Sequence, residues 1–141
     1  MEELLTIENL SVGIASPAGK VQAVRDVSFT LHPGEVLAIV GESGCGKSVL
    51  CKTITKLLPK SAKIEGGKII ASGVDITDYS DKDMRRLRGK LFSMIFQDPM
   101  TALNPTIPIG KQIAEAILIH EPKLPKEKVY NRVIELMELV G

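Results

Sequence analysis

The chain has 141 residues, of which 44% are hydrophobic and 25% are charged, and its formal net charge is +1. These values are typical of one soluble globular domain, and the near-neutral charge gives no general attraction for nucleic acid or for anionic membranes. The clean apolar runs are far shorter than a membrane span, so we expect any membrane association to be peripheral.

Apolar runs of strand length alternate with helical patterns along the chain, in an order typical of an α/β protein. Strands are predicted at 4–10, 24–31, 36–40, 64–72 and 91–96. Helices are predicted at 49–58, 80–88, 109–120 and 125–140. Pro59 is expected to end the first helix, and Gly66-Gly67 predicts a bulge or bend in its strand. Ser80 and Asp83 have the spacing of a capping box.

The segment Gly41 to Ser48 reads Gly-Glu-Ser-Gly-Cys-Gly-Lys-Ser and fits the pattern G-x-x-x-x-G-K-[ST] at every fixed position. It stands between a predicted buried strand and a predicted helix, which is the context that this phosphate-binding loop requires. Glycines let backbone N–H groups face an anion, and the helix start adds its positive dipole end. Lys47 can reach the β- and γ-phosphates, and Ser48 can ligate Mg²⁺. The predicted nucleotide-binding residues here are Gly41, Glu42, Ser43, Gly44, Cys45, Gly46, Lys47, Ser48 and Val49.

Two further features have weaker chemical meaning. Five basic residues gather in a short stretch, namely Lys82, Arg85, Arg86, Arg88 and Lys90. We interpret them as a solvated helix face, with contact to lipid headgroups or an acidic partner as the alternative. Gln97 follows the apolar run at 91–96, where a neutral amide oxygen can ligate a metal and orient water. Ligands bind at the carboxyl ends of strands in open α/β sheets, so Gln97 is a candidate metal ligand beside Ser48.

Three blocks of the sequence resemble the ATP-binding subunits of ABC transporters, in the branch that energises uptake of oligopeptides, dipeptides and nickel. They are Ala23 to Phe29, Val40 to Ser48, and Met94 to Pro105 with its Phe-Gln-Asp-Pro-Met-Thr-Ala-Leu-Asn-Pro run. The resemblance covers Leu4 to Gly141. It implies a P-loop NTPase core of the ABC ATPase type, with an antiparallel β subdomain ahead of it and the start of a helical subdomain behind.

The resemblance divides the chain into four regions. Residues 1–35 would form the antiparallel β part, 36–58 the phosphate-loop strand and helix, 59–98 a β/α region reaching Gln97, and 99–141 the start of the helical subdomain. By the same resemblance ATP and Mg²⁺ are the ligands, and Gln97 is the Q-loop glutamine. The loop at 98–108 would face transmembrane permease subunits, so the protein would lie on the cytoplasmic side of the cell membrane. A second ATP-binding subunit would complete a head-to-tail dimer.

The sequence departs from the family pattern in two ways. Family members usually stack adenine on an aromatic residue in the early strand loop, but no aromatic residue lies between Leu10 and Ser28, so we expect Ile14 and Val21 to contact adenine instead. The chain also contains no apolar run ending in Asp-Glu, no Leu-Ser-Gly-Gly-Gln signature and no later switch histidine.

We therefore expect the 141-residue chain to bind ATP–Mg weakly or not at all, and not to hydrolyse it alone. Unpaired sheet edges are expected to make it self-associate. One alternative is a non-catalytic nucleotide-binding or assembly remnant. Another is a small-molecule kinase or GTPase, which is disfavoured because the guanine motif Asn-Lys-x-Asp and the switch motif Asp-x-x-Gly are absent.

Overall fold

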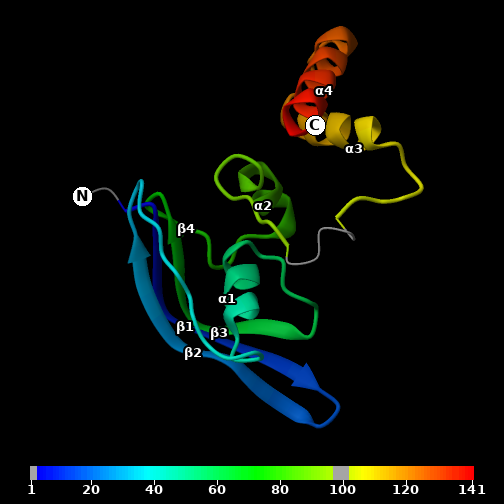
Figure 1. Cartoon of the computed structure of the whole chain (residues 1–141). Helices are drawn as coiled ribbons and strands as arrows, with labels where there is room; N and C mark the ends of the chain where they lie inside the picture. The colour runs from blue at the N-terminus through cyan, green and yellow to red at the C-terminus, as the bar shows by residue number, and fades with distance from the viewer. Residues whose placement is uncertain (1–2, 97–101) are drawn as a thin grey trace. The chain divides into compact units, whose positions relative to one another are not determined.

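The structure is a computed structural model that describes residues 3–96 and 102–141. It divides into two compact units, Met1–Ser93 and Met94–Gly141, and each is described by itself. The first contains a sheet and two helices, and the second contains two helices (Figure 1).

The sheet of the first unit has four antiparallel strands in the order β2-β1-β3-β4. Their bounds are β1 Leu5–Ser16, β2 Gly19–Leu31, β3 Ala62–Ala71 and β4 Val74–Asp75. β1 and β2 form a long hairpin in which Val12 pairs with Val24 and Leu10 with Val27. Such apolar cross-strand pairs stabilise a sheet face. The antiparallel β part predicted from the sequence is confirmed, and its strands are longer than expected.

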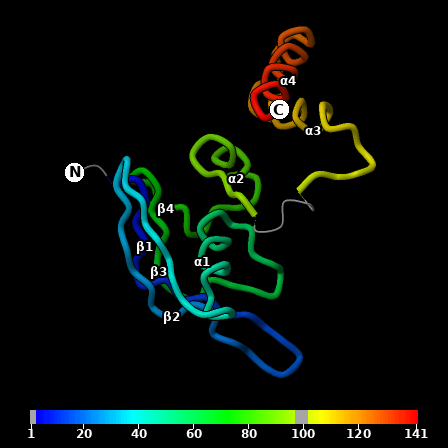
Figure 2. Tube along the Cα trace, viewed as in Figure 1, coloured from blue at the N-terminus to red at the C-terminus, as the bar shows by residue number. Residues whose placement is uncertain are grey.

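Each of the three long strands contains a residue with a left-handed backbone conformation. Asn9 in β1 and Asp26 in β2 both have φ 48, and Gly67 in β3 has φ 88. A β-carbon at Gly67 would lie 2.4 Å from the carbonyl oxygen of Glu8, so this position needs glycine. The β1–β3 register shifts at the same place, which confirms the predicted bulge at Gly66-Gly67. The sheet bends visibly along its length (Figure 2), as aligned bulges produce.

The core lies between one face of the sheet and the helices. Its most deeply buried side chains, all at most 1% exposed, are Ile7, Leu10, Val12, Ile69, Ile76 and Met84. Helix α1 (Lys47–Ile54) adds Leu50 and Ile54 to this cluster. Burying an aliphatic side chain contributes roughly 1.5–3 kcal/mol, so this packing fixes α1 against the sheet.

Helix α2 (Asp81–Leu87) begins with the predicted capping box, which is confirmed. The Ser80 hydroxyl accepts from the Asp83 N–H, and the Asp83 carboxylate accepts from the Ser80 N–H. Arg88, which the sequence suggested to be one of several solvated basic residues, has a structural role instead. Its guanidinium donates to the carbonyl oxygens of Thr55 (3.1 Å) and Lys56 (2.9 Å) and to Asp81 (2.7 Å). It thereby joins α2 to the backbone that follows α1.

Two predicted strands are wrong. Residues 36–40 and 91–96 are not strands, and Val36, Val40 and Ile95 are 93%, 91% and 98% exposed. A strand exists only when a neighbour supplies its hydrogen-bond ladder, and along the described parts of the chain these segments have no such neighbour. Phe92 makes only an isolated bridge with Arg88.

The first helix is also shorter than predicted. It ends at Ile54 rather than reaching Leu58. Lys56 adopts φ 55, a left-handed conformation that stops a helix, before Pro59 can do so.

The second unit contains the two predicted helices, α3 (Ile109–His120) and α4 (Lys126–Val140), and both are confirmed. They pack through Val129 and Val133 of α4, each 6% exposed, and a β-carbon at Gly110 would contact Val133 at 3.6 Å. Within residues 3–96 and 102–141, no helix combines the length and apolar character that crossing a bilayer requires.

Candidate functional site

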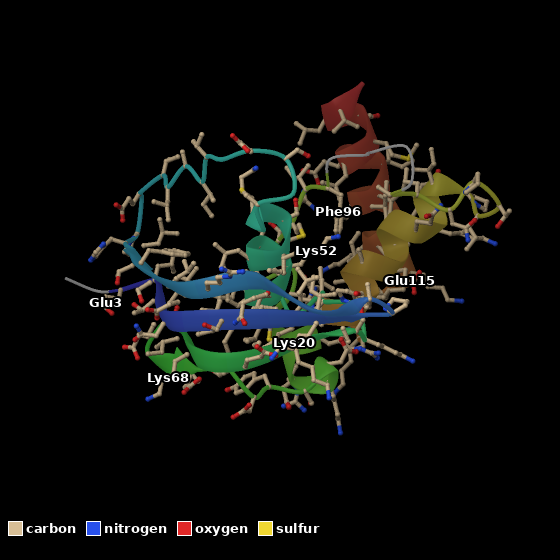
Figure 3. All side chains as sticks on the ribbon, turned by 90° about the horizontal axis from the view of Figure 1, so that it is seen from below. Glu3, Lys20, Lys52, Lys68, Phe96 and Glu115 are labelled. Atoms are coloured by element: carbon tan, nitrogen blue, oxygen red, sulfur yellow. The ribbon has the colours of Figure 1, made fainter. Side chains whose placement is uncertain are left out.

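The predicted phosphate loop leads directly into α1. It belongs to a segment that arches away from the sheet between β2 and α1 (Figure 3). Gly44 and Gly46 have φ 82 and 98, values that favour glycine. The Leu50 N–H donates to the Gly46 carbonyl at 2.9 Å and closes the first helical turn. The N–H groups of residues 47–49 therefore precede the first intrahelical bond, and they are the donors that a helix start offers to an anion.

Strand β2 lies directly against the end of this loop. A β-carbon at Gly46 would lie only 2.1 Å from the carbonyl oxygen of Ala23, so the loop backbone rests directly on β2. Gly46 is also the N-cap of α1 and makes no side-chain cap bond. Glycine is required here both by the φ value and by this close approach.

The Lys47 ammonium lies within its own loop. Its Nζ donates to the carbonyl oxygens of Gly41 at 2.7 Å and Glu42 at 2.6 Å, and it lies 3.5 Å from the Cys45 sulfur. A β-carbon at Gly41 would be 2.7 Å from that sulfur. Cys45 therefore forms part of the loop wall, and its thiol is free.

The donor set of the loop fits a polyphosphate. It combines an ammonium with the N–H groups at the start of α1, and the first turn of α1 contains no acidic residue to repel an anion. Of the two predicted Mg²⁺ ligands, Ser48 lies in the first turn of α1, whereas Gln97 lies outside the described residues. No cluster of three His, Cys, Asp or Glu side chains able to hold a metal occurs in 3–96 or 102–141.

The two residues predicted to contact adenine are cross-strand partners. Ile14 in β1 pairs directly with Val21 in β2, so their side chains share one face of the hairpin. Val21 is 57% exposed, and Ile14 is half-buried against the edge of the core. Val21 is two residues from Ala23, which contacts Gly46. Strand β2 thus carries one member of the apolar pair, Val21, and also supports the predicted phosphate loop at Ala23.

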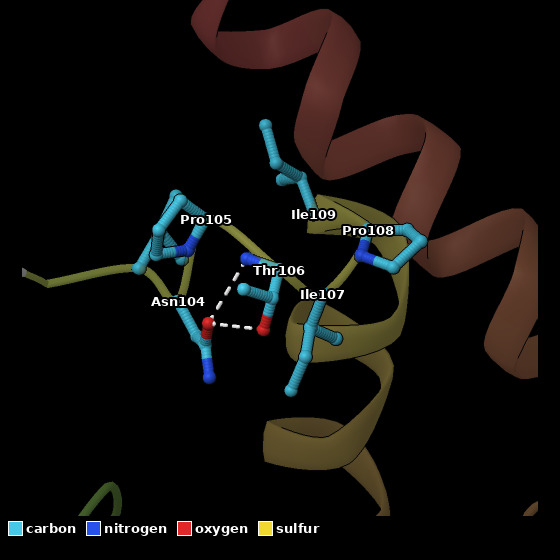
Figure 4. A pocket seen from close by; sticks show the side chains of 7 residues that line it. Asn104, Pro105, Thr106, Ile107, Pro108 and Ile109 are labelled. Atoms are coloured by element: carbon cyan, nitrogen blue, oxygen red, sulfur yellow. Dashed lines mark hydrogen bonds between the residues drawn. The ribbon is translucent and has the colours of Figure 1, made fainter.

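A polar turn precedes α3 in the second unit, within the segment that the sequence predicts to be a loop. The Asn104 Oδ1 accepts hydrogen bonds from the Thr106 N–H at 3.0 Å and the Thr106 hydroxyl at 2.7 Å. The turn borders a shallow hollow lined by residues 103–109 (Figure 4). The Asn-Pro-Thr stretch is typical turn chemistry. The Gln112 side chain of α3 also bonds to this turn, accepting from the Asn104 N–H at 2.8 Å and donating to the carbonyl oxygens of Asn104 and Ile107, and no sequence pattern indicates these bonds.

Acidic residues partly neutralise the predicted basic cluster. Asp81 forms ion pairs with Arg88 at 2.7 Å and with Arg85 at 3.0 Å. Hydrogen bonds from Arg88 and then Arg85 lower the pKa of the Asp81 carboxyl. Two of the five basic side chains, Arg85 and Arg88, are therefore paired with Asp81. This pairing weakens the alternative interpretation that the cluster contacts lipid headgroups or an acidic partner.

Comparisons with known proteins agree with these features. A family model described as "ABC transporter" matches residues 24–141. The chain is 51% identical over 142 residues to the dipeptide transport ATP-binding protein DppD of Bacillus subtilis strain 168. It is 49% identical over 139 residues to the oligopeptide transport ATP-binding protein OppD of the same strain. These matches cover 100% and 98% of this chain but 42% and 38% of the relatives, so the chain spans less than half of their length.

A solved structure shares the fold. The ATP-binding cassette MJ0796, in a dimeric post-hydrolysis state bound to ADP and Pi, superposes with a TM-score of 0.77 at 19% identity. The match covers 95% of this chain and 56% of that one. The predicted fold class, a partial cassette with an antiparallel sheet ahead of helices, is confirmed. The predicted resemblance to ATP-binding proteins of the dipeptide and oligopeptide branch is confirmed as well, and the chain belongs to the ABC transporter family.

Proposed function

We propose that this chain is the nucleotide-binding part of an ABC transporter subunit and that its phosphate loop holds the triphosphate of ATP. The observation that supports this most directly is the Lys47 ammonium, bonded to Gly41 and Glu42 beside the start of α1. An ammonium and a set of helix-start N–H groups converge on one short loop. That combination binds phosphate groups in proteins generally.

Each predicted site residue has a role in this proposal. The Lys47 ammonium exchanges its hydrogen bonds to the two loop carbonyls for hydrogen bonds to the β- and γ-phosphates. The backbone of residues 41–49 surrounds these phosphates. The Ser48 hydroxyl would hold Mg²⁺, with Gln97 as a further ligand, and a bound Mg²⁺ would supply positive charge beside the phosphate oxygens. Ile14 and Val21 provide an aliphatic surface for adenine, where an aromatic residue would contribute about 0.5–1.5 kcal/mol more.

The whole protein would couple ATP binding and hydrolysis to uptake of peptides or a metal chelate. The names of the relatives, dipeptide and oligopeptide transport ATP-binding proteins, support the peptide class. Its partners would be transmembrane permease subunits and a second ATP-binding subunit, in line with the dimeric state of the similar cassette. The complex would lie at the cytoplasmic face of the membrane.

The 141-residue polypeptide alone would bind ATP–Mg weakly or not at all, and it would not turn ATP over. Phosphoryl transfer needs metal, positioning and a water-orienting group together, and the printed sequence has no acidic Asp-Glu pair after an apolar run and no signature motif. This observation also supports the second candidate function, a non-catalytic nucleotide-binding or assembly module. Steady phosphate release by the pure chain, abolished by Lys47→Ala, would contradict the proposed inactivity.

A titration with fluorescent ATP and Mg²⁺ tests the binding proposal. Lys47→Ala should weaken binding by about ten- to a hundredfold, because a charged hydrogen bond to phosphate contributes about 1.5–3 kcal/mol. Lys52→Ala is the matched control, since Lys52 lies in the last turn of the same helix (Figure 3). Equal affinities for Lys47→Ala and the wild type would overturn the assignment. A polypeptide of the relatives' length, measured in parallel, separates weak binding from absent binding.

A further inference from the structure

Strand β2 changes its pairing with β1 at the point where it meets the predicted phosphate loop. Val12 and Gly13 are adjacent in β1, but their partners in β2, Val24 and Gln22, are separated by Ala23. An extra residue of this kind bends a strand and leaves its own backbone outside the ladder. The Ala23 carbonyl is also the group that leaves no space for a side chain at the end of the loop. The irregularity in β2 and the phosphate loop therefore lie in contact.

A second irregularity follows in the same strand. Here β2 places two residues, Arg25 and Asp26, opposite the single residue Ser11 of β1. The Ser11 hydroxyl accepts from the Asp26 N–H at 3.0 Å. Asp26 has φ 48, a conformation in which Asn and Asp are enriched over other side chains. The stretch of β2 around Ala23 thus lies next to a second break of the ladder, so its path depends on side-chain hydrogen bonds.

Asn9 of β1 provides the next of these hydrogen bonds. Its N–H donates to the Ser28 hydroxyl at 2.8 Å, and its Nδ2 donates to the Asp26 Oδ1 at 2.9 Å. On its other side, a β-carbon at Gly67 of β3 would lie 2.5 Å from the Asn9 carbonyl oxygen. Asn9 is therefore fixed between β2 and β3, and its amide holds Asp26, three residues from Ala23 in the chain.

We propose that Asn9 and Asp26 are positioning residues for the phosphate site. Their side-chain hydrogen bond fixes the path of β2 at Ala23, and the Ala23 carbonyl in turn fixes the end of the phosphate loop. The inference rests on the function proposed above, because it concerns the loop that would hold the triphosphate. It goes beyond that function because it assigns part of the affinity for phosphate to two exposed side chains of the sheet.

Asn9→Asp removes this hydrogen bond with a minimal change of shape. Aspartate also adopts φ near 48 readily, but the substitution replaces the Nδ2 donor with an oxygen and places two carboxylates side by side. The double variant Asn9→Asp with Asp26→Asn exchanges donor and acceptor, so the hydrogen bond forms again in the opposite direction. Gln22→Glu is the matched control, because it adds the same negative charge at an exposed position of β2 next to Ala23.

The experiment uses a polypeptide of the relatives' length. Fluorescent ATP with Mg²⁺ is titrated well below the melting temperature, and tripolyphosphate then displaces it. Tripolyphosphate has no base, so its affinity reports on the phosphate loop alone. In Asn9→Asp both affinities should fall about three- to tenfold, the size expected for one pair of interacting side chains. The double variant should recover wild-type affinities, and Gln22→Glu should match the wild type for both ligands.

Three outcomes would overturn the inference and leave the proposed function intact. A lower melting temperature of Asn9→Asp with both affinities unchanged would show a merely structural role. A loss of affinity for ATP but not for tripolyphosphate would place the effect at the predicted adenine contacts, Ile14 and Val21. An equal loss in Gln22→Glu, or no recovery in the double variant, would show that added charge and not the hydrogen bond is responsible.

A different result would overturn the proposed function, and the inference with it. Lys47→Ala is measured beside the other variants and should weaken binding of tripolyphosphate as well as of ATP. If the wild type and Lys47→Ala bind tripolyphosphate equally, the loop at 41–48 is not the phosphate site, and its position relative to β2 has no bearing on nucleotide binding.

Discussion

The Nζ of Lys47 lies 2.7 Å from the carbonyl oxygen of Gly41, so the loop backbone itself supplies a hydrogen-bond acceptor for this cation. A phosphate group must replace this carbonyl and that of Glu42 as the partner of the ammonium. The exchange replaces neutral acceptors with an anionic one, which adds the Coulomb attraction between two opposite charges.

The first prediction concerns thermal stability with and without nucleotide. ATP with Mg²⁺ should raise the melting temperature of the wild type, because a ligand at a hundred times its Kd adds about 2.7 kcal/mol. Lys47→Ala should melt near the wild-type temperature without nucleotide, since the loop carbonyls are exposed, but should show little or no shift with ATP. Differential scanning fluorimetry measures both. An equal shift in both proteins would contradict the proposed role of Lys47.

The second prediction concerns Arg88. Arg88→Ala should lower the free energy of unfolding by about 1.5–3 kcal/mol, because it removes charge-assisted bonds to two backbone carbonyls and to Asp81. Arg85→Ala is the control. Its side chain is 73% exposed and pairs with Asp81 alone, so its loss should cost at most about 1 kcal/mol. Urea unfolding compares the two variants, and similar losses would contradict the assigned role.

The third prediction concerns acid stability at the start of α2. Bonds from the Ser80 hydroxyl and then the Ser80 N–H lower the pKa of Asp83 below its ordinary value of 3.8. A carboxyl whose pKa is lower in the folded state stabilises the fold above its unfolded value. This contribution disappears as the pH falls through the folded value. Asp83→Asn should therefore be less stable than the wild type at neutral pH, and the difference should shrink in acid.

Melting curves between about pH 7 and about pH 2.5 measure this difference. Glu115→Gln, an exposed position on α3, serves as a charge-matched control with no capping role. A constant difference between Asp83→Asn and the wild type across the range would show that the capping carboxylate does not contribute through its ionisation.

The fourth prediction is self-association of the 141-residue chain. The segment at 36–40 lies outside every strand and helix and exposes apolar side chains, with Val36 at 93% and Val40 at 91%. Unpaired extended backbone with apolar side chains recruits another strand. Light scattering at increasing concentration should detect dimers or larger species. The double substitution Val36→Lys and Val40→Lys should reduce the amount of these dimers or larger species. Val74→Lys, at a 50% exposed position in strand β4, should not. A monomer at high concentration would refute this expectation.

The sequence predicts well the elements whose partners are close in the chain. The hairpin follows from alternating apolar residues, and the Ser80–Asp83 cap from a three-residue spacing. The strand predicted at 36–40 is wrong because an apolar pattern indicates a tendency to be buried but does not supply the neighbouring strand. Arg88 and Gln112 were missed because they bond to backbone oxygens, which every residue has. The phosphate loop can be predicted from the sequence because its chemistry needs fixed residue types.

The contact between Gly46 and the Ala23 carbonyl has a mechanical consequence. Since no side-chain atom fits between Gly46 and the Ala23 carbonyl, the β1–β2 hairpin and the predicted phosphate loop are in direct backbone contact. Any tightening of the loop around a ligand is therefore transmitted to β2 without an intervening flexible group. An exchange of this hairpin between related proteins would have to preserve the path of the backbone at Ala23.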